Sequence, residues 1–184
     1  MDVKGTAFIA RRNFVGREHG IETFDGIVAD VAKSHPVLAE QIIATTRMPV
    51  RAFLELNDAI VDRLYGGDPQ SYYRFGEASA EWGLTVGPYK NLVTERSVRG
   101  LVASVPSIYR SYFNGGQAEA RLVSETSGEL HLSGISPQHV YFEFGVSGYF
   151  KRGLELVSDR PVTTVVKRGF SKGDRDVLHI MTVG

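Results

Sequence analysis

The sequence predicts an α+β fold in which a helical N-terminal half packs on a C-terminal antiparallel sheet of about four strands. Two observations predict it. Apolar residues recur mostly at helical spacing up to Asn114-Gly115-Gly116, and beyond that point they alternate with polar residues, as in half-buried strands. The last third of the chain also contains a glycine-rich aromatic segment, FEFGVSGYFKRGLELV, followed by β-branched and apolar runs. We therefore expect a late helix to pack on a closing antiparallel hairpin.

The first elements are a short strand and two helical segments. Residues 3–10 are compatible with a strand, and residues 13–20 are typical of a loop. Residues 22–34 carry apolar side chains at helical spacing, and His35-Pro36 ends that run. One or two helical turns are expected over residues 37–44.

The strongest helical pattern covers Val50–Tyr65, and Gly66-Gly67 end it. Asp68 and Pro69 then have the residue types of an N-cap and a first helical position. The helix that they begin is expected to continue to the break at Gly87-Pro88.

Two further helices, over residues 89–94 and 98–113, complete the helical half. Pro106 lies inside the second and predicts a kink or a boundary there, because proline lacks the N–H that a helix interior needs.

The second half is expected to contain two hairpins separated by a helix. The first joins strands at residues 118–124 and 129–133 through Thr126-Ser127-Gly128. The helix covers residues 139–157. The second hairpin joins strands at residues 162–167 and 177–183, and the turn at Lys172-Gly173-Asp174 uses the conformational freedom of glycine.

Composition limits the classes of protein. A chain of 184 residues with no internal repeat predicts one domain, residues 1–184. The 21 basic and 21 acidic residues balance, so no overall field favours nucleic acid. The chain contains no cysteine, which excludes disulfides and thiolate metal sites and suits a cytoplasmic location. No segment reaches the ~20 apolar residues that span a bilayer, and the N-terminus lacks the pattern of a signal peptide.

Motifs for enzymatic chemistry are missing from the sequence, so we expect a protein that is not an enzyme. The segment GVSGY at residues 145–149 differs from a nucleophile elbow at its last position, and neither phosphate-binding nor dinucleotide-binding glycine motifs occur. Glu77 and Glu81 are four residues apart and could share a metal. No Glu-x-x-His accompanies them, so a solvated helix face is the favoured interpretation.

Aromatic residues and glycines supply the candidates for a ligand site. Aromatic side chains at helical spacing are usually core, but two helices that carry them can also line a pocket for an apolar ligand. Glycines inside a helix each cost about 1 kcal/mol relative to alanine, which indicates close packing on the sheet or a partner chain, or a ligand against the glycine face. The candidate ligand-binding residues are Trp82, Tyr109, Tyr72, Phe113, Gly145 and Gly148, with Trp82 and Tyr109 as first choices.

The order of elements resembles the 4-vinyl-reductase-type small-molecule-binding domain, whose fold is shared with TRAPP trafficking subunits and is distantly similar to haem-nitric-oxide-binding domains. More closely, the chain resembles a myxobacterial paralogous family of uncharacterised proteins. The segments that carry this resemblance are KGTAFIA, GGDPQSYYRFGEASAEWGL, VPSIYRSYFNGGQAEARLV and FGVSGYFKRGLELVSDRPVTTVVKRGFSKGDRDVLHIMTV. Vinyl-reductase relatives often carry cysteines near the closing hairpin, and this chain has none. A metal or redox role therefore does not carry over.

The distant similarity raises the question of haem. The haem-binding relatives take a proximal histidine from the helix ahead of the sheet, followed by a Tyr-x-Ser-x-Arg anchor. Here no histidine occurs between His35 and His131, and the nearest anchor-like string, at residues 109–113, ends in Phe113 instead of arginine. We expect no haem, no other cofactor and no structural metal.

Two functional interpretations remain. The first is a bacterial signalling module, not an enzyme, that holds a small apolar ligand between helices and sheet. The second is a dimeric protein-interaction domain without a ligand. A homodimer is expected, with Val50–Tyr65 as its contact helix, because Ala52, Leu56 and Ala59 lie off the main apolar stripe. The alternative is that Leu56 completes the monomer core.

Overall fold

The computed structural model describes residues 1–87 and 89–184 and has the predicted α+β architecture. The helices are α1 (Gly5–His19), α2 (Ile21–Val31), α3 (Val50–Tyr65), α4 (Ser71–Thr85), α5 (Lys90–Thr94), α6 (Val98–Tyr112) and α7 (Val140–Ser158), with short 3-10 helices at Pro36–Ala39 and Phe170–Lys172. The strands are β1 (Asp2–Lys4), β2 (Arg47–Pro49), β3 (Gln117–Leu122), β4 (Ser127–Ser133), β5 (Val162–Arg168) and β6 (Val177–Val183).

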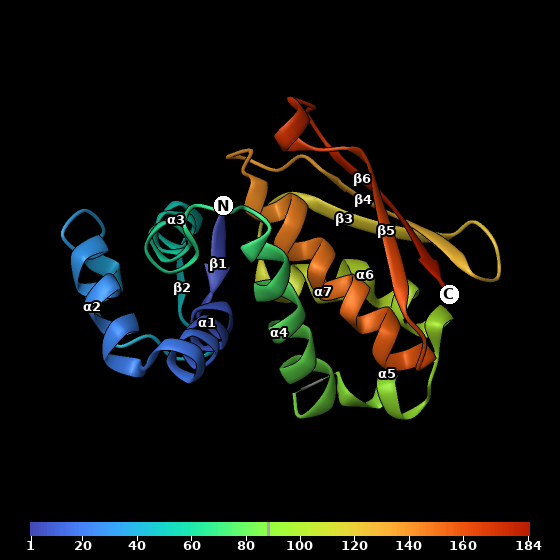
Figure 1. Cartoon of the computed structure of the whole chain (residues 1–184), viewed down its shortest axis with the longest axis horizontal. Coiled ribbons are helices and arrows are strands. Elements are labelled where there is room, and N and C mark those ends of the chain that lie inside the picture. The colour runs from blue at the N-terminus through green and yellow to red at the C-terminus, as the bar shows by residue number, and fades with distance from the viewer. Residues whose placement is uncertain (88) are drawn as a thin grey trace.

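The four C-terminal strands form one antiparallel sheet in the order β3-β4-β6-β5, which confirms the predicted sheet. The ladder between β5 and β6 contains an irregularity between Val166 and Arg168. Helix α7 runs along one face of the sheet, and α4 packs on the other side of α7 (Figure 1). Helices α1 to α3 gather beyond α4, around the small β1-β2 sheet (Figure 1). Helix α7 is thus the central element of the fold.

The two best-predicted helices have the predicted bounds or nearly so. Helix α3 begins at Val50 and ends at Tyr65, and Gly66 follows it in the left-handed conformation with φ of 63°. Helix α7 begins one residue after His139, whose Nδ1 accepts a hydrogen bond of 3.0 Å from the Tyr141 N–H. His139 is therefore the N-cap of the central helix.

The predicted strand over residues 3–10 and the predicted loop over residues 13–20 are wrong, because α1 begins at Gly5 and continues to His19. Only Asp2–Lys4 is extended, and it pairs with β2, which was not predicted. The helical face of α1 was not recognised because Arg11 lies in the middle of it and is buried. A charged residue at a core position interrupts the apolar spacing that indicates a helix.

Other predicted boundaries need smaller corrections. Helix α4 begins at Ser71, and Asp68 instead accepts a hydrogen bond of 2.9 Å from the Gln70 N–H in the preceding turn. The turns expected over residues 37–44 reduce to one 3-10 helix that ends at Ala39. Helix α6 passes through Pro106 without a boundary. Of the predicted break at Gly87-Pro88, Pro88 lies outside the described residues.

Glycines bring α4 and α7 into backbone contact. A Cβ on Gly76 would collide with the Gly145 carbonyl oxygen, and a Cβ on Gly148 would lie 3.0 Å from the Tyr73 carbonyl carbon. The sequence indicated close packing at Gly145 and Gly148 but not at Gly76. The partner is helix α4, however, and not the sheet.

The α3 residues that predicted a dimer face lie in the core. Ala52 and Leu56 are both 0% exposed, and only Ala59 is partly accessible. The argument that placed a dimer interface on these residues is therefore wrong. They complete the monomer core instead.

The inward face of β6 carries a buried histidine with consequences for acid stability. His179 is 0% exposed, and neither ring nitrogen makes a well-formed hydrogen bond to a described residue. Burial, with a smaller contribution from the Lys172 charge, lowers the pKa of His179 to about 4 from 6.5. The unfolded chain therefore takes up a proton at a higher pH than the folded chain does.

We expect the free energy of unfolding to fall by about 3 kcal/mol as the pH drops from 6.5 to 4, and to lose nothing further from this group below that window. Urea titrations of the wild type and of His179→Phe should diverge across this range. Ion-paired Asp30 and Asp176 act at lower pH, because their pKa values are held at about 2. An equal loss in the variant would contradict the assignment to His179.

Candidate functional site

A small cavity lies where helices α1, α4, α6 and α7 meet, and we call it the tyrosine cavity. Its walls are formed by Ala7, Gly76, Ser79, Ile108, Tyr109, Tyr112, Phe113, Tyr141, Gly145, Val146, Tyr149 and Phe150. Its volume is about 40 Å³. Tyr141, Gly145 and Tyr149 are spaced four residues apart on α7 and so form one stripe of that helix. The glycine contact between α4 and α7 thus lies within the wall of this cavity.

Two tyrosines that line the tyrosine cavity, Tyr112 and Tyr149, bring their hydroxyls together beside Gly83 on α4. A Cβ built on Gly83 would lie 2.9 Å from the Tyr149 hydroxyl and 3.5 Å from the Tyr112 hydroxyl. The Tyr149 hydroxyl is buried and makes no well-formed hydrogen bond to any described residue. Burial, followed by the neighbouring Tyr112, raises the pKa of Tyr149 well above its usual value. The cavity is therefore apolar except for neutral hydroxyl groups. One of these has an unused hydrogen-bonding capacity.

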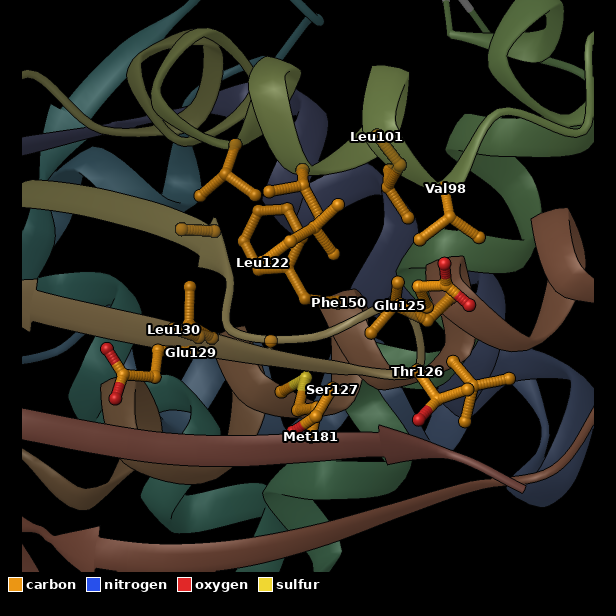
Figure 2. A pocket seen from close by; sticks show the side chains of 16 residues that line it. Val98, Leu101, Leu122, Glu125, Thr126, Ser127, Glu129, Leu130, Phe150 and Met181 are labelled. Atoms are coloured by element: carbon orange, nitrogen blue, oxygen red, sulfur yellow. The ribbon is translucent and has the colours of Figure 1, made fainter.

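A second cavity lies between α6, α7 and the inner face of the sheet, and we call it the sheet cavity (Figure 2). Its volume is about 30 Å³. The lining residues are Val98, Leu101, Val102, Val105, Ala120, Leu122, Glu125, Thr126, Ser127, Gly128, Glu129, Leu130, Phe150, Leu154, Met181 and Val183. Its polar residues come from the β3–β4 turn and the adjoining part of β4. Phe150 lines both cavities and so stands between them.

The structure brings together three of the six predicted ligand-binding residues. Tyr109, Phe113 and Gly145 all line the tyrosine cavity. Their ligand-binding role stays a prediction. Tyr109 is partly committed to the fold, because its hydroxyl donates a 2.9 Å hydrogen bond to the Gly115 carbonyl oxygen.

The other three predicted residues lie elsewhere. Trp82 is 43% exposed on the outer side of α4 and lines neither cavity. The Tyr72 hydroxyl donates to Asp58, which also bonds to His139. Gly148 lies against the backbone of Tyr73. The sequence singled out neither Tyr141 nor Tyr149. Their spacing of two helical turns around Gly145 was the available signal.

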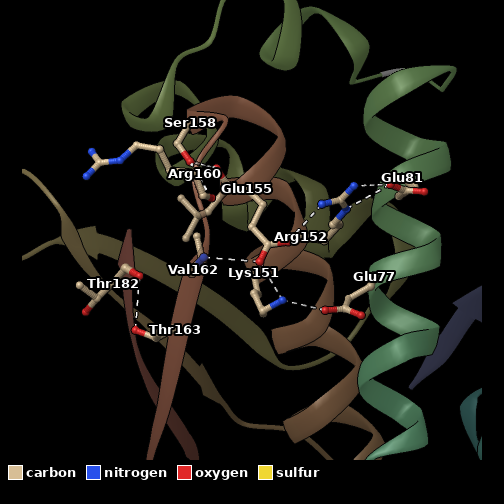
Figure 3. Close-up of polar contacts among 11 residues, drawn as sticks. Glu77, Glu81, Lys151, Arg152, Glu155, Ser158, Arg160, Val162, Thr163 and Thr182 are labelled. Carbon is tan, nitrogen blue, oxygen red and sulfur yellow. Dashed lines mark hydrogen bonds and ion pairs between the residues drawn. The ribbon is translucent and has the colours of Figure 1, made fainter. Parts of the chain in front are cut away.

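Glu77 and Glu81 belong to an ion-pair network between α4 and α7 (Figure 3). Glu77 lies 2.9 Å from Lys151 Nζ, and Glu81 lies 2.5 Å from Arg152. Glu155 pairs with both Lys151 and Arg152. Burial by itself would raise the pKa of Glu155, but the hydrogen bonds from these two cations have the larger combined effect and lower it. Within residues 1–87 and 89–184, no group of three or more histidine, aspartate and glutamate side chains could hold a metal ion. The glutamates therefore have a structural role.

Solved structures with the same fold are H-NOX proteins. A crystal structure of an H-NOX protein from S. oneidensis in the Fe(II)NO ligation state has a TM-score of 0.75 at 14% identity, and the match covers 98% of this chain and 99% of that chain. An NMR structure of an H-NOX domain from Shewanella oneidensis in the Fe(II)CO ligation state has a TM-score of 0.76 at 14% identity, with 98% of each chain covered. An Fe(II) unliganded H-NOX mutant from K. algicida has a TM-score of 0.70 at 13% identity, covering 98% and 96%.

At these identities the likeness establishes the fold alone, which is that of the H-NOX domains. The distant similarity to haem-nitric-oxide-binding domains indicated by the sequence is thus confirmed at the level of fold. No family model and no curated protein matches the chain. Within the described part of the chain, no helix is long and apolar enough to cross a membrane.

Haem is the prosthetic group that this fold implies, since the H-NOX family is studied for its haem. The residues of this chain do not fit it. Neither cavity is lined by a histidine, and Met181 is the one sulfur ligand among their walls. Tyrosine can bind haem iron, but burial raises the pKa values of Tyr109, Tyr141 and Tyr149, so their phenolates are disfavoured. Phe113, at the position of the expected arginine, is buried and apolar.

We therefore expect that the protein, mixed with one equivalent of haemin and desalted, will retain no haem. The measurement is the absorption spectrum, in which a bound haem gives a strong Soret band. Elemental analysis of the purified protein should likewise show no stoichiometric metal. A Soret band that persists through desalting, or metal at one equivalent, would overturn this expectation.

Proposed function

We propose that the protein is a ligand-binding sensor module without enzymatic activity, and that a small apolar molecule binds in the tyrosine cavity. The observation that carries the proposal is the buried hydroxyl of Tyr149, which has no well-formed hydrogen bond within the described protein and belongs to a residue that lines an otherwise apolar space. Apolar walls with a few convergent polar groups are typical of small-molecule sites. A ligand with one hydrogen-bonding group would satisfy the hydroxyl.

The volume of the cavity sets a condition on the ligand. A cavity of about 40 Å³ has room for roughly three water molecules, whereas a site for a drug-sized ligand measures ~300–1,000 Å³. A larger ligand must therefore displace a wall. Phe150 is the side chain whose movement would join the tyrosine cavity to the sheet cavity. Binding is then expected to change the contact between α7 and the sheet, which is a route for signalling.

The fold supports this proposal, because two of the H-NOX structures with this fold are in an Fe(II)NO and an Fe(II)CO ligation state. One core cluster extends from Val3 to Met181, which supports a single domain over residues 1–184. Membership of the myxobacterial paralogous family and the vinyl-reductase relationship rest on the sequence resemblance. A cytoplasmic location stays a prediction.

A matched pair of cavity-filling variants tests the site. Ile108 lines the tyrosine cavity, and Val105 lines the sheet cavity about one turn earlier on α6. We expect Ile108→Phe to weaken binding of octan-1-ol at least about tenfold, because the added ring occupies the space that the ligand needs. Val105→Phe should weaken binding less, because it fills only the sheet cavity, which the ligand enters past Phe150. Both changes overpack the core by about 1–3 kcal/mol, so a thermal melt must accompany the calorimetric titration. If Val105→Phe weakened binding more than Ile108→Phe did, the ligand would instead lie in the sheet cavity.

A protein-interaction function is the second candidate, and an exposed apolar pair favours it. Trp82 is 43% exposed and Val86 is 72% exposed, and their spacing of four residues places them on one side of the end of α4. A homodimer that forms here should dissociate in Trp82→Glu without loss of thermal stability. Light scattering over a range of concentrations measures the subunit count. A wild type that is monomeric at every concentration would reject the homodimer.

A further inference from the structure

Arg11 is a buried cation with no anionic partner. Its side chain is 1% exposed, and no carboxylate in residues 1–87 and 89–184 forms an ion pair with it. Nε donates a hydrogen bond of 2.5 Å to Asn57 Oδ1, and the guanidinium carbon lies 3.6 Å from the centre of the Phe75 ring. Nη1 makes no well-formed hydrogen bond to a described residue, and the Tyr141 hydroxyl is the main group that offsets the lowering of the Arg11 pKa by burial. A neutral amide and an aromatic ring compensate a buried charge only in part.

Arg11 remains charged at neutral pH in spite of its burial. Burial lowers the pKa of Arg11 to about 10, which still lies well above neutrality, and the neighbouring Tyr141, Tyr65 and Tyr72 act in the opposite direction. The carboxylate of Asp58 pairs with Tyr72 and His139 and not with Arg11. The protein thus maintains an unneutralised cation inside its helical core. Buried charges in proteins are as a rule paired.

The guanidinium lies next to the wall of the tyrosine cavity. Arg11 is one helical turn from Ala7 on α1, and Ala7 lines the cavity. The ring stacked under the guanidinium belongs to Phe75, the neighbour of the lining residue Gly76. Tyr141, which lines the cavity from α7, lies beside Arg11 as well. Residues of α1, α4 and α7 therefore place the guanidinium directly behind the wall of the tyrosine cavity, which Arg11 itself does not line.

We propose that the ligand of the tyrosine cavity is a small organic acid whose carboxylate pairs with Arg11 Nη1. The apolar body of the acid then lies among the aromatic walls. Guanidinium and carboxylate form charge-assisted hydrogen bonds, which are stronger than neutral ones, and the pair would neutralise the buried charge. This inference rests on the proposed function and specifies its ligand class.

The test compares octanoate with octan-1-ol, which share a chain length and differ in charge. Near neutral pH we expect the wild type to bind octanoate at least about tenfold more tightly than octan-1-ol in calorimetric titrations. Arg11→Met should lose the preference for octanoate over octan-1-ol. Arg12→Met is the matched control, because Arg12 is exposed and pairs with Asp25. It should behave as the wild type.

The wild-type comparison does not depend on whether a variant folds, and NMR adds a positional readout. The Arg11 Nε–H resonance should shift with octanoate and not with octan-1-ol. The organic-acid proposal would be rejected if the wild type bound the two probes equally, or if Arg11→Met kept a preference for octanoate. The proposal of an apolar ligand would stand in both cases. If neither probe binds, the proposed function fails together with this inference.

Discussion

Gly76→Ala is expected to cost several kcal/mol of stability, although it adds a single methyl group to a helix. The new Cβ would collide with the Gly145 carbonyl oxygen and would lie 2.7 Å from the Tyr149 nitrogen. Both groups belong to the backbone of α7, so no side-chain rotation relieves the clash. Overpacking of a well-packed core costs about 1–3 kcal/mol and occasionally more, and here two helices must separate. Because these helices also form a wall of the tyrosine cavity, binding of octan-1-ol should be lost with the packing.

Gly26→Ala is the matched control for Gly76→Ala. Gly26 lies on the exposed face of α2, and nothing approaches its Cβ position within 4 Å. The same substitution should there raise the free energy of unfolding by up to about 1 kcal/mol, since alanine has the better helix propensity. In urea titrations the free energy of unfolding should fall for Gly76→Ala and rise for Gly26→Ala. Equal stability changes would show that the backbone contact between α4 and α7 has no energetic weight.

Leu56→Glu is expected to unfold the protein rather than to dissociate a dimer. Leu56 is 0% exposed in the monomer core, so the change places a carboxylate where no water reaches it. The loss of apolar burial contributes about 2–3 kcal/mol, and an unpaired buried polar group adds about 2–7 kcal/mol. The sum is comparable to the whole stability of a domain of this size.

Leu56→Met provides the control, because a change that keeps volume and apolarity costs less than about 1.5 kcal/mol. Thermal melts followed by circular dichroism, with light scattering on the same samples, separate unfolding from dissociation. A Leu56→Glu protein that keeps the wild-type melting temperature and halves its mass would restore α3 as a dimer helix.

The predictable part of the fold is the part where apolar spacing is regular. Helix α3 and the four-stranded sheet were predicted because their apolar residues repeat at one period along the element. Helix α7 is buried continuously from Tyr141 to Phe150 and was predicted from its glycine-rich aromatic segment instead. Helix α1 was missed because Arg11 occupies a core position. Arg11, which interrupts the apolar spacing of α1, is also the buried charge that we propose binds the ligand. Local rules fail where a residue is selected for something other than packing.

The candidate site was predictable only in part for a related reason. Spacing alone identified Tyr109 and Phe113 as inward-facing aromatic residues, and the structure places both in the same wall. The same reasoning could not show that Trp82 faces outward. It also could not show that the hydroxyl of Tyr149 has no well-formed hydrogen bond, because that property depends on residues distant in the sequence.

The irregular pairing between β5 and β6 has a consequence for solubility. Strand β5 is an outer strand of the sheet, with an unpaired row of backbone groups that another extended chain could join. The register shift between Val166 and Arg168 bends this edge, and the exposed Lys167 places a charge on it. Both features oppose edge-to-edge aggregation. Growth of the sheet from the β5 edge into the next copy is therefore disfavoured.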